Sequence, residues 1–121
     1  MARVILIADD SPTIRKFVSI ALSIHGYEVI AASDGMEAIE KLPQSNIDLV
    51  ITDLNMPNLD GYELIKTIRQ DERFKDIPII ILSSLSKEGD VEKGLASGAN
   101  SYIIKPFDPK RIQYEVSKYL N

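Results

Sequence analysis

The chain has 121 residues, of which 45% are hydrophobic and 26% charged, the size and composition of one globular domain with its own core. A net charge of −4 argues against a nucleic-acid-binding face, and the absence of cysteine excludes disulfides, thiolate metal sites and a cysteine nucleophile. No apolar run has the length of a signal peptide or a membrane span, so we expect a cytoplasmic protein that binds neither nucleic acid nor membrane directly.

Five short runs rich in isoleucine and valine recur along the chain. Each run is apolar on both faces, as in strands that are buried on both sides of a parallel sheet. The predicted strands lie within residues 3–9, 27–33, 47–53, 77–84 and 101–105.

Amphipathic helical patterns separate the predicted strands. The first helix follows Ser11 as a cap, has Pro12 in its first turn and stops near Gly26. The others are expected at about 34–42, 60–70 and 88–97, and from 108 to the end. Residues expected to face inward are Ile14, Phe17, Val18, Ala21, Leu22, Met36, Ile39, Leu42, Leu64, Ile65, Ile68, Ile112, Val116 and Leu120. This alternation predicts a (βα)5 fold: an α/β three-layer sandwich around a doubly wound parallel sheet with right-handed crossovers.

Polar residues follow each predicted strand, and parallel strands bring their carboxyl ends to one edge of the sheet, where ligands bind. After the second strand these residues, Ser33-Asp34-Gly35, are interpreted as a helix cap. Each residue alone has a structural explanation, as a helix cap, a turn residue or a solvated lysine. Their coincidence at one edge favours a binding site. The residues are Asp9 and Asp10 after the first strand, Asp53 after the third, Ser83 and Ser84 after the fourth, and Lys105 after the fifth.

Three carboxylates without histidine or cysteine form a hard oxygen site, which suits Mg²⁺ or Mn²⁺ better than Zn²⁺. A nearby ammonium and hydroxyl are what phosphoryl transfer requires, because they stabilise the transferring oxygens. The sequence has no P-loop and no GxGxxG motif, so a nucleotide cradle is not indicated. A carboxylate would then itself accept the phosphoryl group as an aspartyl phosphate.

The combination of Asp9-Asp10, Asp53 followed by NMPNLDG, Ser83 and Lys105-Pro106-Phe107 closely resembles the receiver domain of bacterial response regulators, over the whole chain. The resemblance implies a flavodoxin-like sheet with strand order 2-1-3-4-5. It also implies a single receiver domain over residues 1–121, similar to a stand-alone chemotaxis regulator without an output domain.

The implied function is two-component signal transduction. A histidine kinase or a histidine phosphotransfer protein would pass a phosphoryl group to Asp53 in the presence of Mg²⁺. The surface of the fourth helix, fifth strand and fifth helix would then change and control a downstream protein. Such a module catalyses only its own phosphorylation and dephosphorylation, so we do not expect an enzyme that acts on external substrates.

The resemblance also assigns roles to individual residues. Asp10 would bind Mg²⁺ directly, Asp9 through water, and Asp53 and the backbone carbonyl of Asn55 would complete the protein ligands. The Ser83 hydroxyl, chosen over Ser84 by its spacing, would bind the phosphoryl group. Lys105, joined to Pro106 by a cis bond, would pair with that group, and Tyr102 would be the aromatic switch.

Two positions qualify this picture. Leu85 is apolar where some rapidly dephosphorylating relatives carry an acid, and we hypothesise that self-hydrolysis is therefore slow. His25, the only histidine, lies near the end of the first helix, so the donor histidine must come from a partner. We expect a monomer, and dimerisation on activation is left open.

Three alternatives remain at this point. The chain could be the N-terminal receiver of a larger DNA-binding regulator. It could be a Mg²⁺-dependent phosphatase or phosphotransferase, although no length is left for a cap or lid. A flavodoxin-like FMN carrier is disfavoured, because Asp9 and Asp10 would repel the FMN phosphate.

Overall fold

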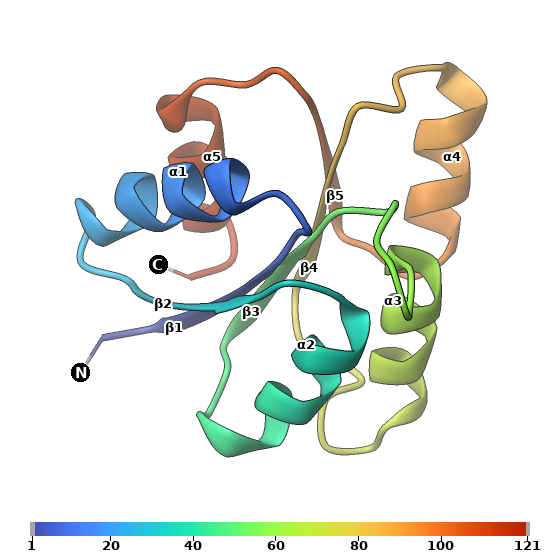
Figure 1. Cartoon of the computed structure of the whole chain (residues 1–121), viewed down its shortest axis with the longest axis horizontal. Coiled ribbons are helices and arrows are strands. Elements are labelled where there is room, and N and C mark those ends of the chain that lie inside the picture. The colour runs from blue at the N-terminus through green and yellow to red at the C-terminus, as the bar shows by residue number, and fades with distance from the viewer. Residues whose placement is uncertain (1, 121) are drawn as a thin grey trace.

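The computed structural model describes residues 2–120 and has a five-stranded parallel sheet between two layers of helices (Figure 1). The sheet has the order β2-β1-β3-β4-β5, which confirms the expected strand order. The strands are β1 (Val4–Ala8), β2 (Glu28–Ala32), β3 (Leu49–Thr52), β4 (Ile79–Ser83) and β5 (Ser101–Ile104).

The helices are α1 (Pro12–Ser23), α2 (Gly35–Lys41), α3 (Gly61–Gln70), α4 (Glu88–Ala96) and α5 (Pro109–Ser117), and a short 3₁₀ turn, η1 (Leu42–Gln44), follows α2. Four helices begin at a side-chain cap, which satisfies a free backbone N–H at the first turn. The capping residues are Ser11, Asp34, Asp60 and Asp108. Within residues 2–120, no helix has the length and apolarity needed to cross a membrane.

The helices divide the core into two parts. Helices α1 and α5 cover one face of the sheet, and α2, α3 and α4 cover the other (Figure 1). In β1, for example, Ile5 and Ile7 lie in the core beneath α1 and α5, whereas Leu6 and Ala8 lie in the core beneath α2 and α3. Both faces of the central strands are therefore buried, which explains why these strands are almost continuously apolar.

Two residues expected to face inward are exposed instead. Phe17 is 38% exposed and packs edge-to-face against Phe107, with ring centroids 5.4 Å apart. Met36 is 48% exposed, because α2 buries the face that carries Gly35 and Ala38. The first turn of α2 packs closely against Leu59 of a neighbouring loop at Gly35.

Arg69, at the end of α3, forms hydrogen bonds with two segments near the amino ends of β4 and β5. The Arg69 guanidinium donates to the carbonyl of Gly98 at 2.9 Å, to the carbonyl of Ile77 at 2.7 Å and to the carbonyl of Lys75 at 2.9 Å. It also donates to the side-chain oxygen of Asn100 at 3.0 Å. These bonds join α3 to the segments that precede β4 and β5.

We predict that Arg69→Met destabilises the protein by about 2–3 kcal/mol, because half-buried carbonyls lose a charged donor that methionine cannot replace. Arg73→Met is the matched control. Arg73 is exposed, and its hydrogen-bonding side-chain partner is Asp71, so little change is expected. Urea unfolding of both variants measures the difference, and equal midpoints would contradict the structural role of Arg69.

Candidate functional site: an acidic cluster at the carboxyl ends of the strands

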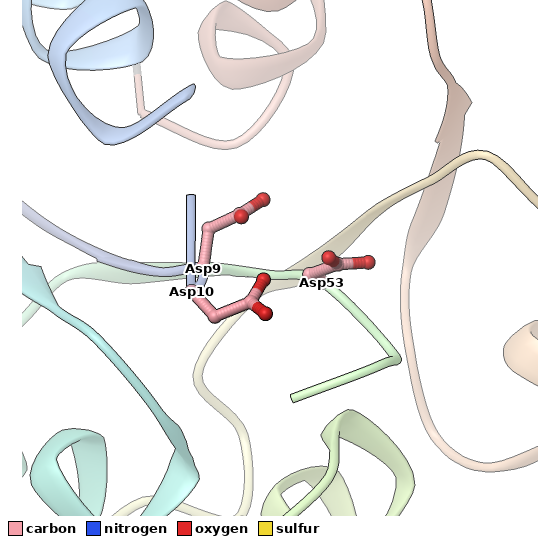
Figure 2. Close-up of side chains that lie close together, drawn as sticks. All are labelled: Asp9, Asp10 and Asp53. Atoms are coloured by element: carbon pink, nitrogen blue, oxygen red, sulfur yellow. The ribbon is translucent and has the colours of Figure 1, made fainter. Parts of the chain in front are cut away.

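The sheet register brings the carboxylates of β1 and β3 together. Ala8 at the end of β1 pairs with Thr52 at the end of β3, so Asp9 and Asp53 emerge side by side. The backbone N–H of Asp53 donates to the Ala8 carbonyl at 2.9 Å and continues this pairing. One carboxylate oxygen from each of Asp9, Asp10 and Asp53 lies within 4.8 Å of the other two. Figure 2 shows the three side chains close together beyond the ends of the two strands.

Lys105 brings a positive charge into this cluster from the end of β5. Its Nζ lies 3.0 Å from Oδ2 of Asp9 and 3.3 Å from Oδ2 of Asp53. The backbone N–H of Lys105 donates to the Ser83 carbonyl at 2.8 Å, which extends the β4–β5 pairing to the site. The Lys105–Pro106 peptide bond is cis, as expected. The ammonium therefore bridges two of the three carboxylates.

The three carboxylates have different surroundings. Asp9 is fully buried, and its second oxygen accepts the backbone N–H of Ser11 at 2.9 Å. Asp53 is 7% exposed, and its Oδ1 accepts the N–H of Leu54 at 2.7 Å. Asp10 is exposed, and within residues 2–120 no side-chain hydrogen bond or ion pair involves its carboxylate. Of the three, the Asp10 carboxylate thus has the fewest bonds to other protein groups.

The shifted pKa values reflect this crowding. Burial raises the pKa of Asp53 above its ordinary value, and the charge of Asp9 raises it further, while Lys105 partly opposes the shift. Burial alone would lower the pKa of Lys105. Hydrogen bonds and charge from Asp9 and Asp53 outweigh burial, so the pKa of Lys105 is raised overall. The site therefore has more negative charge than its one ammonium balances.

The donor set fits a hard divalent cation. All three candidate side-chain ligands are carboxylates, the ligand type that Mg²⁺ prefers. Mg²⁺ binds oxygen at about 2.0–2.1 Å, so two of its ligands can be at most about 4.2 Å apart. The observed cluster, within 4.8 Å, requires only a small contraction to reach that geometry.

Ser83 and Tyr102 are linked through the backbone of Leu85. Ser83 is fully buried and its hydroxyl accepts the N–H of Leu85 at 3.1 Å, whereas Ser84 is exposed. The Tyr102 hydroxyl donates to the carbonyl of Leu85 at 2.8 Å. A single peptide segment after β4 thus contacts both residues that the sequence suggested for a switch.

Two site features differ in how visible they are in the sequence. Asn55 lies two residues beyond Asp53 and is exposed, and the role of its backbone carbonyl stays a prediction from the family resemblance. Arg15, in the first turns of α1, was not among the candidates, although it donates to the carbonyl of Asp9 at 2.7 Å. The sequence did hold a signal for this contact, because Arg15 lies one turn into a helix that directly follows Asp9 and Asp10.

Comparison with known proteins agrees with this geometry. The family model of the response regulator receiver domain matches residues 5–117. The chain is 42% identical over 119 residues to the chemotaxis protein CheY1 of Helicobacter pylori, and the match covers 96% of this chain and 95% of that protein. The receiver domain of the sensor histidine kinase PA1611 from Pseudomonas aeruginosa, solved with a magnesium ion in its active site cleft, is 30% identical. It superposes with a TM-score of 0.90 over 99% of this chain and 98% of that one.

A second kind of relative is longer. The chain is 42% identical over 116 residues to the "Probable transcriptional regulator ycf27" of Porphyridium aerugineum, with 96% of this chain covered. The chain spans about half the length of that relative, 47%. The family model covers most of this chain, and relatives of both kinds match it at 42% identity, so this chain belongs to the response regulator receiver domain family of two-component systems.

Proposed function

We propose that this receiver domain accepts a phosphoryl group on Asp53 with the help of Mg²⁺ and, by doing so, changes the surface that it presents to a protein partner. The observation that carries the proposal is the cluster of Asp9, Asp10 and Asp53 around the ammonium of Lys105, at the carboxyl edge of the sheet. Asp9, Asp10, Asp53 and the backbone carbonyl of Asn55 would hold Mg²⁺, which would neutralise charge on the transferring oxygens. Residues 1–121 would together form one receiver unit.

Asp53 is the nucleophile in this proposal. One of its carboxylate oxygens attacks the phosphorus of a phosphohistidine, and the new O–P bond forms as the P–N bond breaks. The imidazole leaves with the electron pair of that bond. The Lys105 ammonium, now shared between Asp9 and Asp53, pairs with the phosphoryl oxygens, and the Ser83 hydroxyl donates to one of them.

The donor histidine belongs to another protein. His25 follows the end of α1, whereas Asp9 and Asp10 precede its start. The helix has 12 residues, so its length of about 18 Å separates the two ends. An apolar hollow of about 360 Å³, lined by Phe17, Lys105 and Phe107 among others, opens beside the site and offers a donor protein a contact surface. A histidine kinase or a histidine phosphotransfer protein fits this role.

The same proposal explains how phosphorylation would reach the surface. When the Ser83 hydroxyl turns to a phosphoryl oxygen, it releases the N–H of Leu85. The carbonyl of the same residue holds the Tyr102 hydroxyl, so the segment after β4 and the tyrosine would shift together. Tyr102 would then repack between α4 and β5.

The partner surface lies where these elements meet. Leu95 of α4 and Ile104 of β5 are each 41% exposed, and Tyr114 of α5 is 62% exposed. Because β5 packs against both α4 and α5, these exposed apolar side chains offer area that a protein partner could bury. In a longer regulator of the ycf27 kind, the partner would be a second part of the same polypeptide, and the phosphorylation step in the receiver would be unchanged.

We predict that Asp53→Asn abolishes phosphorylation. The parent, incubated with acetyl phosphate and Mg²⁺, should gain one acid-labile phosphoryl group by intact mass, and omission of Mg²⁺ should prevent this. Asp76→Asn is the control, because Asp76 is an exposed aspartate outside the cluster. Metal-dependent uptake by Asp53→Asn equal to that of the parent would show that the site is assigned wrongly.

We predict that the same substitution stabilises the metal-free protein, by about 1 kcal/mol at neutral pH. The raised pKa of Asp53 means that its ionised form is disfavoured in the folded state, so the parent loses stability as pH rises through that pKa. The difference in free energy of unfolding between Asp53→Asn and the parent should therefore become smaller as pH falls toward 3.8, the ordinary aspartate pKa. Denaturant unfolding with EDTA at several pH values measures this gap, and a less stable variant at neutral pH would refute the prediction.

We predict that Leu85→Glu speeds the loss of the phosphoryl group, by a factor of about ten or more, because a carboxylate at this position can orient the attacking water. Leu85→Met keeps the apolar character and should dephosphorylate at the parental rate. The decay of the intact-mass adduct after removal of the donor measures the rate. Hydrolysis by Leu85→Glu no faster than in the parent would count against the hypothesis.

A further inference from the structure

The loop between β3 and α3, residues 54–60, carries the site's least anchored candidate ligand, the backbone of Asn55. The loop follows Asp53 directly and is mostly exposed, apart from Leu54 and the half-buried Met56 and Leu59. Its C-terminal end is fixed where the N–H of Gly61 donates to the Leu54 carbonyl at 2.9 Å. The tip of the loop needs a different anchor.

That anchor comes from the start of α2, 24 residues earlier in the chain. The side-chain amide of Asn58 donates to Oδ2 of Asp34 at 2.6 Å. Next to it, the backbone N–H of Gly35 donates to the Leu59 carbonyl at 3.2 Å. Two hydrogen bonds, one from a side chain and one from the backbone, thus join the loop tip to the first turn of α2.

Asp34 is held in the orientation that this contact requires. Its Oδ1 accepts the N–H of Glu37 at 2.8 Å, which caps α2 and leaves Oδ2 directed at Asn58. The N–H of Glu37 and the amide of Asn58 hold the pKa of Asp34 below its ordinary value. The acceptor is therefore an oriented, ionised carboxylate, and bonds to such a group are stronger than neutral ones.

The backbone at both sides of the contact suits only small or special residues. Asn58 has a φ of 67°, in the left-handed region that asparagine tolerates better than most residues. Gly35 packs so closely on the loop that a Cβ atom there would overlap the Leu59 carbonyl and lie 2.9 Å from the Leu59 Cβ. A larger residue at position 35 would therefore require α2 or the loop to shift.

We propose that Asp34, Asn58 and Gly35 are positioning residues, which hold the loop 54–60 so that the Asn55 carbonyl and the Asp53 carboxylate are preorganised for Mg²⁺. This inference rests on the proposed metal site. Metal ligands must be held within about 0.5 Å of their productive positions. Outer contacts that orient ligands typically change metal affinity by 10–100-fold. Loss of the Asp34–Asn58 bond should therefore weaken Mg²⁺ binding by about tenfold.

Asn58→Gly is the first test variant, because glycine accepts the left-handed backbone and removes only the side chain. Asn46→Gly is a matched control: Asn46 is also an exposed asparagine with a left-handed backbone, at φ 47°, but it precedes β3 and lies at the opposite edge of the sheet. Isothermal titration with Mg²⁺ should show about tenfold weaker binding for Asn58→Gly and parental binding for Asn46→Gly.

A reversed pair tests the contact itself. In Asn58→Asp, two carboxylates face each other, and the bond is lost. Adding Asp34→Asn restores a donor and an acceptor with their roles exchanged, keeps the parental net charge and retains a good cap for α2. The double variant should regain Mg²⁺ affinity to within about threefold of the parent. Without metal, amide hydrogen exchange over residues 54–60 should be faster in Asn58→Gly than in the parent. In the Asp34→Asn, Asn58→Asp double variant it should be close to the parental rate.

The outcomes separate this inference from the proposed function. If the parent binds Mg²⁺ and Asp10→Asn does not, the metal site stands. Parental affinity and loop exchange in Asn58→Gly would then overturn the positioning role alone. If the parent itself fails to bind Mg²⁺, or if Asp10→Asn binds it equally well, the proposed site and the positioning role both fail.

Discussion

The structure depends on the balance between three carboxylates and one ammonium at the edge of the sheet. Asp9 and Asp53 are buried side by side, and Lys105 is the cation that bridges them. Two buried like charges are costly unless a cation compensates them, and here one charge remains over. Asp10 adds a third carboxylate at the rim. The site thus retains a negative charge excess that a divalent cation can neutralise.

The fold holds these charges together with backbone bonds rather than with side-chain packing. The β1–β3 pairing continues into the N–H of Asp53, and the β4–β5 pairing continues into the N–H of Lys105. The backbone positions of Asp53 and Lys105 are therefore fixed by the sheet itself. Beyond the strands, side chains attach two loops: the Ser83 and Tyr102 hydroxyls both bond to the backbone of Leu85, and Asn58 joins the loop after β3 to the start of α2.

Much of this arrangement could be predicted from the sequence. Aliphatic runs ending in polar residues located the strands, and parallel topology then placed Asp9, Asp53 and Lys105 at one edge, where the structure has them. The strand order came from the family resemblance rather than from periodicity. The roles of the site residues in metal binding and phosphoryl transfer stay predictions.

Local sequence patterns could not predict the contacts between segments that are far apart in the chain. Phe17 and Met36 have the spacing of inward residues, but their exposure is decided by neighbours, Phe107 in one case and the rotation of α2 in the other. The contacts of Arg69 with the Gly98 carbonyl and of Asp34 with Asn58 join residues 29 and 24 positions apart. Nothing in a helical or strand period marks such partners, because they depend on how the elements pack.

The most direct measurement is a crystal structure of this domain with Mn²⁺, located by its anomalous signal, and beryllium trifluoride as a phosphoryl mimic. We expect one metal ion bound by Asp10 and Asp53, and the fluoride complex joined to a carboxylate oxygen of Asp53. Lys105 and the Ser83 hydroxyl should contact the fluorine atoms. A metal ion bound away from Asp10 and Asp53, or a fluoride complex joined to any other residue, would contradict the account.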